Sequence, residues 1–332
     1  RYDRQHYDQG TKMSYCLSCL KEIEKSSYCK SCQRKLFNNK LPVLQFTKAK
    51  FGKIQYELTD HFSISGVQEK ISLKLGKDKL IPTASSGEYI LKPVPGTPVP
   101  RFQEDIPANE HLTMQIATKV FKLNTAENAL IRFADGELAY LTKRFDRINN
   151  RKFRQEDFCQ LSGRTPEIDG ENFKYKGSYQ GAGKIIQKFC AAHKIEIEKL
   201  FKLIVFNYIF GNGDAHLKNF SLIETRSGDF ILSPAYDLIN TSIHFPNESR
   251  TALELFDNFK TKFFQANGFY GRPDFHKLAE FFKMNLQRSE RFLDSFFKQK
   301  EKVIALIERS FLSEEARAEY IRSFKDRLKA LK

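Results

Sequence analysis

The residues whose types and spacing are best suited to catalysis lie in Gly211–Phe220, which reads GNGDAHLKNF. Asp214 and Asn219 have the Asp-to-Asn spacing of a kinase catalytic loop. In phosphoryl transfer, this spacing lets the aspartate accept the proton of the acceptor hydroxyl while the asparagine amide oxygen holds a magnesium ion. His216 is suited to bracing the loop, and Lys218 to neutralising the transferred phosphoryl group. The same pattern also fits a glycine-rich polar turn that caps a helix.

A second acidic residue follows shortly after this loop. Ser233–Asp237 (SPAYD) comes after two predicted strands, Phe220–Ile223 and Phe230–Leu232, which a Ser-Gly-Asp turn joins. A carboxylate that arrives there can face Asn219 and complete a magnesium site, because magnesium prefers a few carboxylate or carbonyl oxygens together with phosphate oxygens. The alternative for Asp237 is the N-cap of a helix.

Further upstream, a lysine and a glutamate occupy positions suited to binding phosphates. Lys92 ends the predicted strand Glu88–Lys92 and can reach the α- and β-phosphates of a nucleotide, while Glu110, early in the next helix, can hold it in place. Ser63–Lys70 (SISGVQEK) precedes this strand, but its single glycine, Gly66, fits neither a Walker A motif nor a G-x-G-x-x-G loop. A solvated lysine and a plain turn are the alternatives. The order of these parts along the chain is that of a kinase.

Four of the six cysteines form a metal-binding pattern. The spacing C-x2-C-x9-C-x2-C is made by Cys16, Cys19, Cys29 and Cys32, and it brings two thiolate pairs to one tetrahedral site. The segment is too short for a core of its own, so zinc would supply its folding free energy. Four thiolates leave no open position for catalysis, which indicates a structural role; a disulfide or redox role is the alternative. We therefore expect Cys16→Ser to release zinc and unfold this segment alone. The other two cysteines, Cys159 and Cys190, are predicted buried thiols.

The elements that must position these residues divide into two lobes. The first combines strands with one amphipathic helix, because apolar residues alternate in Ile71–Leu75 and recur at helical spacing in Asn109–Phe121. Its other predicted parts are the proline-rich loop Pro93–Pro100 and the strands Ala129–Phe133 and Ala139–Phe145.

The second lobe is predicted to be mainly helical. Leu200–Phe210 is apolar on nearly all sides, which marks a central buried helix that leads into the catalytic loop. Helical segments are also predicted around Gln155–Ser162 and Tyr179–His193. After about Phe275 the pattern is helix after helix, and the predicted N-caps are Asp274 and Ser313.

The composition is that of a folded, basic protein. Its 332 residues are 41% hydrophobic and carry 55 Lys and Arg against 40 Asp and Glu, a net charge of +15. A positive net charge of this size favours acidic partners such as nucleotides and nucleic acids. No apolar run reaches the roughly 20 residues of a membrane-spanning helix, and the N-terminus lacks the apolar region of a secretory signal. A cytoplasmic location is therefore expected.

Four parts are expected along the chain. Residues 1–12 precede Met13 and are interpreted as an extension or a cloning remnant. Residues 13–39 form a four-cysteine zinc knuckle, 40–150 the N-terminal lobe and 151–332 the helical C-terminal lobe. The expected fold class is α+β, with a small mixed lobe followed by a mainly helical one.

Together, these motifs resemble those of the HipA family of bacterial serine/threonine kinase toxins, from about Ser63 to the C-terminus. The resemblance is carried by SISGVQEK at Ser63–Lys70, YILK at Tyr89–Lys92, NEH at Asn109–His111, KRFDR at Lys143–Arg147, QEDFCQ at Gln155–Gln160, NGDAHLKNFS at Asn212–Ser221 and PAYD at Pro234–Asp237. It implies a two-lobed fold, distantly similar to protein kinases and lipid kinases, that uses ATP and Mg²⁺.

The resemblance also implies residue roles. Asp214 matches the catalytic base, with His216 and Lys218 beside it, and Asn219 and Asp237 match the magnesium ligands. The residues assigned to ATP binding are Lys92, Glu110, Ser63, Ser65, Gly66, Val67, Gln68, Lys143 and Phe145, the last two at the hinge that contacts adenine. The family's phosphate loop is also its autophosphorylation site, which maps onto Ser63, with Ser65 as second candidate. Phosphate there would add about two negative charges and block nucleotide binding.

The layout departs from HipA in two respects. Where HipA has an N-terminal subdomain, this chain has only the short cysteine segment, which makes it resemble HipT, the compact kinase of three-part HipBST systems. Lys143 also replaces an acidic hinge residue. The resemblance implies a HipB-like DNA-binding antitoxin, a small HipS-like partner and a protein target such as an aminoacyl-tRNA synthetase, whose phosphorylation inhibits translation. The alternatives are a metabolite or lipid kinase on the same fold and a zinc-ribbon nucleic-acid-binding regulator with an inactive kinase lobe.

Overall fold

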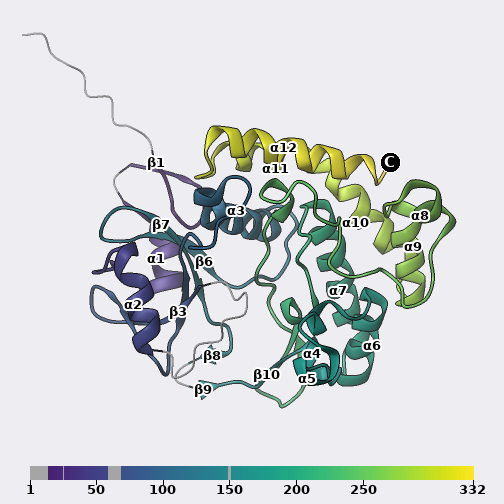
Figure 1. Ribbon diagram of the computed structural model, residues 1–332, viewed down its shortest axis with the longest axis horizontal. Coiled ribbons are helices and arrows are strands. Elements are labelled where there is room, and N and C mark those ends of the chain that lie inside the picture. Colours follow the sequence, from purple (N-terminus) through teal and green to yellow (C-terminus); the bar gives the residue numbers. More distant parts are fainter. Residues whose placement is uncertain (1–13, 25, 59–68, 149–150) are drawn as a thin grey trace, which may run out of the picture.

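The protein folds into a small mixed lobe and a larger helical lobe, as Figure 1 shows. This computed structural model describes residues 14–24, 26–58, 69–148 and 151–332. The expected α+β class is confirmed. The predicted phosphate-loop residues Ser63, Ser65, Gly66, Val67 and Gln68 lie outside the described residues.

An antiparallel sheet of five strands forms the small lobe, in the order β4-β3-β5-β7-β6. The strands are β3 (Ile71–Leu75), β4 (Leu80–Pro82), β5 (Tyr89–Lys92), β6 (Asn128–Arg132) and β7 (Leu138–Lys143). In β3, Ile71 and Leu73 are buried and the residues between and after them are more exposed, which is the period-two pattern that the sequence predicts. β5 lies between β3 and β7, where Lys92 is paired with Tyr140. The phosphate-binding candidate therefore stands on a central strand.

Helix α3 (Ile106–Lys119) packs against β6 and β7, and residues from Ile106 to Ala117 are all buried. It begins three residues before the predicted Asn109, after a short 3-10 turn, Gln103–Asp105. Helix α2 (Lys48–Leu58) lies at the far side of the lobe, in a stretch whose sequence pattern carries few signals. The Glu110 side chain is thus carried by a helix that the lobe fixes along most of its length.

The cysteine segment is built into the small lobe instead of forming a separate knuckle. It consists of β1 (Ser14–Tyr15), β2 (Glu22–Ile23) and α1 (Lys30–Phe37). Leu130 N on β6 donates to Leu17 O at 2.7 Å, and Tyr28 Oη donates to Leu130 O at 2.7 Å. Leu36 and Phe37 join the same hydrophobic core as the sheet. The expectation that this segment could unfold alone therefore does not fit the packing, because its apolar side chains are part of the lobe's interior.

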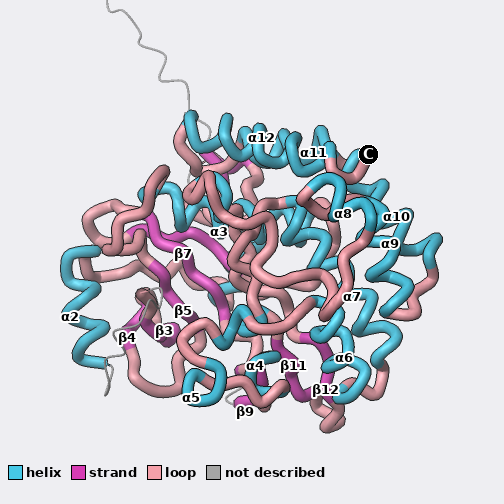
Figure 2. The backbone as a smooth tube through the Cα atoms, turned by 45° about the vertical axis from the view of Figure 1, so that its right-hand side comes forward, coloured by secondary structure: helices cyan, strands magenta, loops and turns pink. Residues whose placement is uncertain are grey.

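The large lobe surrounds helix α7 (His193–Ile209), whose second half is buried on nearly all sides, as predicted. Its other helices are α4 (Phe158–Leu161), α5 (Pro166–Asp169), α6 (Tyr179–Phe189), α8 (Lys262–Asn267), α9 (Arg272–Phe281), α10 (Leu286–Lys298), α11 (Lys300–Glu308) and α12 (Glu314–Lys329). Its strands are β10 (Gln155–Asp157), β11 (Ser221–Glu224) and β12 (Phe230–Leu232), and a small hairpin of β8 (Arg147–Ile148) and β9 (Arg151–Lys152) precedes them. Figure 2 shows β11 and β12 well apart from the strands of the small lobe.

Two local predictions in this lobe are wrong. The segment Gln155–Ser162 was expected to be helical, but its first three residues form β10 against β11, and Asp157 then caps the short helix α4. Asp274 is not an N-cap: it lies in the first turn of α9, where its carboxylate accepts from Gly271 N at 2.7 Å. The predicted N-cap Ser313 is confirmed, since its hydroxyl accepts from Ala316 N.

The two lobes are joined through α3 and α12. Helix α12 runs along the edge of both lobes in Figures 1 and 2. Tyr320 on α12 and Thr113 on α3 share a buried hydrogen bond of 2.8 Å between their hydroxyls. Within the described residues, none of the helices combines the length and the apolar composition needed to cross a membrane.

Candidate functional site

A buried lysine connects the two lobes at the centre of the candidate site. Lys92 Nζ donates to Glu110 Oε1 at 2.7 Å and to Asp237 Oδ1 at 2.5 Å. Lys92 and Glu110 are both almost fully buried, and the ammonium also lies 5.5 Å from the centre of the Tyr140 ring. The structure thus brings together three predicted site residues from a strand, a helix and a loop.

The charges of this triad depend on one another. Desolvation works against the charged form of Lys92, but Asp237 and Glu110 together hold its pKa above the ordinary value. Desolvation raises the pKa of Glu110 to about 7, against the opposing effect of Lys92. The pKa of Asp237 is lowered, since Lys92 and then Lys70 outweigh the desolvation of its carboxylate. At neutral pH the lysine and Asp237 are therefore ionised, and Glu110 is close to its titration point.

Asp237 has an unusual backbone conformation. Its φ is +55°, in the left-handed region that non-glycine residues rarely adopt. Asn212 Nδ2 donates to its carbonyl at 3.2 Å, and Asn219 Nδ2 donates to its carboxylate Oδ2 at 3.3 Å. Such strain is typical of functional sites, where the surroundings fix a side-chain direction. Here it turns the carboxylate toward Asn219.

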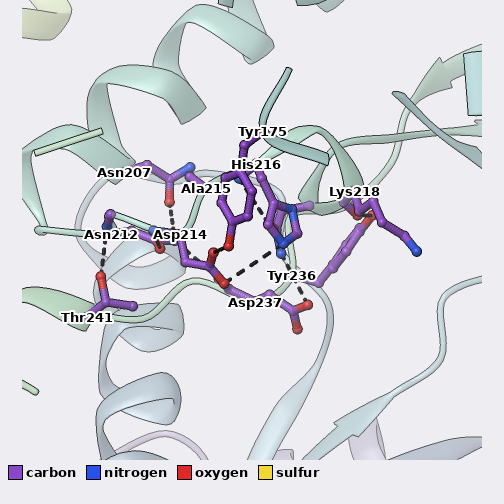
Figure 3. Close-up of polar contacts among 12 residues, drawn as sticks. Tyr175, Asn207, Asn212, Asp214, Ala215, His216, Lys218, Tyr236, Asp237 and Thr241 are labelled. Atoms are coloured by element: carbon purple, nitrogen blue, oxygen red, sulfur yellow. Dashed lines mark hydrogen bonds and ion pairs between the residues drawn. The ribbon is translucent and has the colours of Figure 1, made fainter. Parts of the chain in front are cut away.

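The predicted catalytic loop follows the end of α7, and Figure 3 shows its polar contacts. Gly211 has φ +63°, and a Cβ there would come within 2.7 Å of the Asn240 side chain, so the turn requires glycine. Asn212 is anchored to Asn207 at 2.9 Å, and Gly213 N donates to Thr241 Oγ1 at 2.7 Å. These contacts fix the backbone that presents Asp214.

The side chains of Asp214 and His216 lie close together on this loop. The Asp214 side chain is 49% exposed, and Tyr175 Oη donates to its Oδ1 at 2.5 Å. His216 Nε2 lies 3.8 Å from Asp214 Oδ2, but desolvation lowers the pKa of His216 to about 4. The imidazole is therefore neutral at pH 7. This is consistent with a brace, because the residue is largely buried and its backbone N–H donates to Asn219 Oδ1 at 3.1 Å.

Asn219 and Asp237 form the donor set that the sequence predicts for magnesium. Their side chains meet at 3.3 Å, where Asn219 Nδ2 donates to Asp237 Oδ2, while Asn219 Oδ1 accepts from the His216 backbone N–H. The two residue types offer a carboxylate and an amide oxygen. A magnesium ion suits such a pair, because it completes its shell with water and phosphate oxygens. These two residues would hold the ion, which would neutralise phosphate charge during transfer. The donor types and their position beside Lys92 fit this assignment.

Three consecutive residues tie α3 to three different parts of the molecule. Asn109 Nδ2 donates to Asn240 O at 2.9 Å and Asn109 Oδ1 accepts from Asn240 N at 3.1 Å, in the segment just after Asp237. Glu110 binds Lys92. His111 Nε2 contacts Ser18 O at 2.8 Å and must donate, because a carbonyl only accepts. The sequence motif NEH thus connects α3 to the large lobe, to Lys92 and to the cysteine segment.

At the hinge, the two predicted residues point in different directions. The Phe145 ring lies 5.8 Å from the Tyr236 ring, next to Asp237. The Lys143 side chain points toward the cysteine segment, where its Nζ donates to Lys35 O at 3.3 Å, and its backbone N–H donates to Glu127 O. The Lys143 ammonium is therefore not part of the site. The Phe145–Tyr236 pair is the better candidate for contact with a planar base.

Some residues of the site were not singled out by sequence reasoning. Tyr236 also donates to Lys218 O at 2.9 Å, and Tyr175 contacts Asp214 as described above. Lys70 belongs to the site electrostatically: desolvation lowers its pKa more than the nearby Asp237 raises it. A hollow of about 370 Å³ next to Tyr236 is rich in charged side chains, among them Arg144, Lys152, Arg154, Lys218 and Asp157. Among these missed residues, Tyr236 could have been found from the sequence, because it directly precedes Asp237.

The four predicted metal-binding cysteines are brought together. Their sulfur atoms all lie within 4.8 Å of one another, and Cys19 Sγ is 3.7 Å from Cys29 Sγ. Four thiolates in such a cluster are the donor set of a structural zinc site. Cys159 and Cys190, the other two cysteines, are buried as expected.

Sequence comparison relates the chain to a known family of kinase-like proteins. A profile of the HipA-like C-terminal domain matches residues 62–309. A putative kinase of Haemophilus influenzae is 29% identical, and the match covers 90% of this chain and 92% of that protein. The putative kinase Y4dM of Sinorhizobium fredii is 33% identical, and the serine/threonine-protein kinase toxin HipA of Shewanella oneidensis 28%. The chain spans about half the length of these last two relatives, 48% and 47% respectively.

Solved structures share the fold. HipA in the Shewanella oneidensis complex of HipA, HipB and operator DNA matches with a TM-score of 0.61 and 20% identity, over 86% of this chain and 70% of that one. The Helicobacter pylori proinflammatory kinase CtkA matches with a TM-score of 0.50 and 14% identity, over 73% of this chain and 87% of that one. The two-lobed arrangement predicted from the motifs is thereby confirmed at the level of the fold.

Proposed function

Because the chain belongs to the HipA-like C-terminal domain family, we propose that it is an ATP-dependent protein serine/threonine kinase. The observation that carries this proposal is the position of Lys92, whose Nζ pairs with Glu110 at 2.7 Å and Asp237 at 2.5 Å. A lysine held in this way between a helix carboxylate and a metal-binding aspartate is arranged to bind nucleotide phosphates. The names of the relatives, which include kinases and a serine/threonine kinase toxin, support the same activity.

The proposed reaction divides its tasks among few side chains. Lys92 binds phosphate oxygens, and Asn219 and Asp237 hold the magnesium ion that neutralises them. Asp214 accepts the proton of the acceptor hydroxyl, whose oxygen forms the new bond to the γ-phosphorus as ADP leaves. His216 keeps the loop in place. Lys218 lies at the loop surface, with its Nζ 5.5 Å from the Phe173 ring, from which it can approach the transferred group.

Self-phosphorylation offers a test that needs no known target. Phosphatase-treated protein is incubated with ATP and magnesium, and its intact mass is compared with that of Asp214→Ala. We expect the wild type alone to gain one or two phosphates, at Ser63 or Ser65. A mass unchanged in both would contradict protein kinase activity on this loop.

We also propose that the chain acts as a toxin in the bacterial cytoplasm. The named HipA relative is a toxin, and a structure that shares the fold contains HipB and operator DNA. A HipB-like DNA-binding antitoxin, with or without a small HipS-like protein, is the proposed partner, and an aminoacyl-tRNA synthetase the proposed target. Induced expression of the wild type should arrest growth of a bacterial host, whereas Asp214→Ala should not. Equal growth of both strains at equal protein levels would count against a toxin role.

The cysteine cluster is proposed to hold one structural zinc ion. Its four sulfur atoms have the mutual proximity that tetrahedral coordination requires. Elemental analysis of protein purified without chelator should give one zinc per chain. Protein that contains no metal and is equally stable with and without chelator would exclude this site.

A further inference from the structure

A short segment before the predicted catalytic loop contacts its three predicted catalytic side chains. The 3-10 turn Phe173–Tyr175 lies against the turn Leu217–Asn219 of the catalytic loop. Tyr175 Oη donates to Asp214 Oδ1 at 2.5 Å, and its ring lies edge-on to His216 with centroids 5.2 Å apart. The Phe173 ring lies 5.5 Å from Lys218 Nζ. Figure 3 shows Tyr175 reaching across the loop to Asp214.

The Tyr175 hydroxyl makes the contact that the proposed reaction requires of an acceptor. A neutral hydroxyl that donates to the general base is the arrangement from which proton transfer begins. Desolvation, and next the hydrogen bond to Asp214, raise the pKa of Tyr175, so that its hydroxyl keeps its proton at neutral pH. The second Asp214 oxygen lies toward His216. An acceptor hydroxyl that approaches Oδ1 from the same direction must displace Tyr175.

The contact between Tyr175 and Asp214 has surroundings that allow it to break. Tyr175 is 37% exposed and does not belong to the hydrophobic core, whereas Phe173 of the same turn packs against that core and can hold the turn while Tyr175 moves. The turn is linked to the helix before it by a surface ion pair of Lys176 with Asp169 at 3.8 Å, which contributes little to stability. Gly177, directly behind the turn, has φ +133°. A glycine in this region gives the backbone freedom to move.

We propose that Tyr175 Oη marks the acceptor subsite of this kinase and that the Phe173–Tyr175 turn is an intramolecular occupant which a protein substrate displaces. This inference rests on the proposed kinase activity. In the transfer itself, the acceptor oxygen bonds to the γ-phosphorus, its proton passes to Asp214, and the bond to the β–γ bridging oxygen breaks as ADP leaves. With Tyr175 in place, Oδ1 of this base is engaged by a hydroxyl of the chain itself.

The test compares wild type with Tyr175→Phe, which keeps the ring against His216 and removes only the hydroxyl. The measured quantity is inorganic phosphate released from magnesium-ATP, with water as the acceptor. We expect Tyr175→Phe to raise the rate roughly tenfold, the factor that corresponds to freeing Asp214 from one hydrogen bond to a charged group, with an unchanged KM for ATP. Tyr15→Phe, on β1 of the other lobe, is the matched control and should behave as wild type.

The outcomes separate this inference from the proposed function. No Asp214-dependent phosphate release in any variant, together with no gain of phosphate in the self-phosphorylation test, would overturn the proposed activity and the inference with it. Self-phosphorylation without phosphate release from either wild type or Tyr175→Phe would overturn the inference alone. An Asp214-dependent rate that is unchanged or lower in Tyr175→Phe would leave the kinase standing and overturn the inference, because Tyr175 would then be a surface contact or a positioning group. Phosphate found on Tyr175 itself by mass mapping would place its hydroxyl at the acceptor position directly.

Discussion

At the scale of single residues, the proposed base and the proposed phosphate-binding lysine lie in different surroundings. Asp214 is half exposed and contacts only neutral partners among the described residues, whereas Lys92 is buried between two carboxylates. The first arrangement suits a group that must meet an acceptor, and the second suits a group that must stay in place. The two roles lead to different expectations for substitution.

Removal of the proposed base should slow transfer without weakening nucleotide binding. Asp214→Asn keeps the size of the side chain and removes its basicity, so we expect phosphoryl transfer to fall by about 10²- to 10⁴-fold. The Kd for ATP should stay within about twofold of wild type, because the contacts of Asp214 in the described part of the chain do not include Lys92 or Asp237. Single-turnover kinetics and a separate binding titration check the two parts. A variant that binds ATP normally and transfers at the wild-type rate would rule out this role.

The pH dependence of kcat/KM for ATP should reflect the titration of Glu110. Its pKa is raised to about 7 by desolvation, so its carboxylate is protonated and its ion pair with Lys92 is lost as the pH falls through that value. The ammonium then has Asp237 as its remaining ionised partner in the triad, and this pair competes with the metal. We expect kcat/KM for ATP to fall below about pH 7.

The variants Glu110→Gln and His216→Asn identify the group responsible. In Glu110→Gln, kcat/KM for ATP should be lower than in wild type and should no longer fall as the pH drops below about 7. In His216→Asn this fall should persist, because the pKa of His216 is lowered to about 4 and the ring stays neutral across this range. If kcat/KM still falls at low pH in Glu110→Gln but not in His216→Asn, the titrating group is His216 and not Glu110.

At the scale of elements, α3 connects the cysteine segment to the proposed nucleotide site. His111 contacts the carbonyl of Ser18, which lies between two of the cysteines, and the preceding residue binds Lys92. The helix is buried along most of its length, and a displacement at His111 would therefore be transmitted to Glu110. Metal binding and phosphate binding are thus expected to depend on each other, although the cysteines are not part of the site.

Loss of one proposed zinc ligand should consequently weaken ATP binding. Cys16→Ser should release zinc, raise hydrogen exchange in α3 and weaken ATP binding by about tenfold, because a loosened Ser18 no longer fixes His111. Cys190→Ser, at the end of α6 in the other lobe, is the control and should keep its zinc. Metal analysis, hydrogen exchange and ATP titration measure the three effects. Zinc loss with unchanged exchange in α3 would show that the segment is independent after all.

At the scale of the whole molecule, the lobes are joined by buried polar contacts. Asn109 makes reciprocal hydrogen bonds with the Asn240 backbone, and the Thr113 hydroxyl bonds to Tyr320. All these residues are buried, so a group that loses its partner there also loses contact with water. The junction therefore fixes how the small lobe faces the catalytic loop.

Disruption of this junction should affect both stability and nucleotide affinity. Asn109→Ala leaves the Asn240 N–H and carbonyl without partners and should lower the free energy of unfolding by about 2–4 kcal/mol. Tyr320→Phe removes one hydroxyl and should lower it by about 1 kcal/mol. Urea unfolding gives both values, and ATP titration should show weaker binding for Asn109→Ala in particular. Equal, small losses in both variants would mean that Asn109 does not determine the lobe orientation.

Several parts of this protein could be predicted from the sequence because their signals are local. The alternation in Ile71–Leu75 and the apolar run of Leu200–Phe210 predicted their elements, since each depends on the period of one strand or helix. The spacings of Asp214–Asn219 and of the four cysteines were equally readable, since each set lies within a short stretch. Local signals were misleading at Gln155, where pairing with β11 outweighed the helical pattern that follows it.

Which of these parts meet depends on the tertiary fold. Lys92 and Asp237 are 145 positions apart and Tyr175 and Asp214 are 39 apart, so no local pattern brings either pair together. The cysteine segment likewise joined the small lobe because its few apolar side chains gain more by packing against the sheet than a segment of that size can gain alone. Long-range contacts follow from how the whole chain buries its apolar surface and satisfies its buried polar groups, and both are properties of the assembled fold.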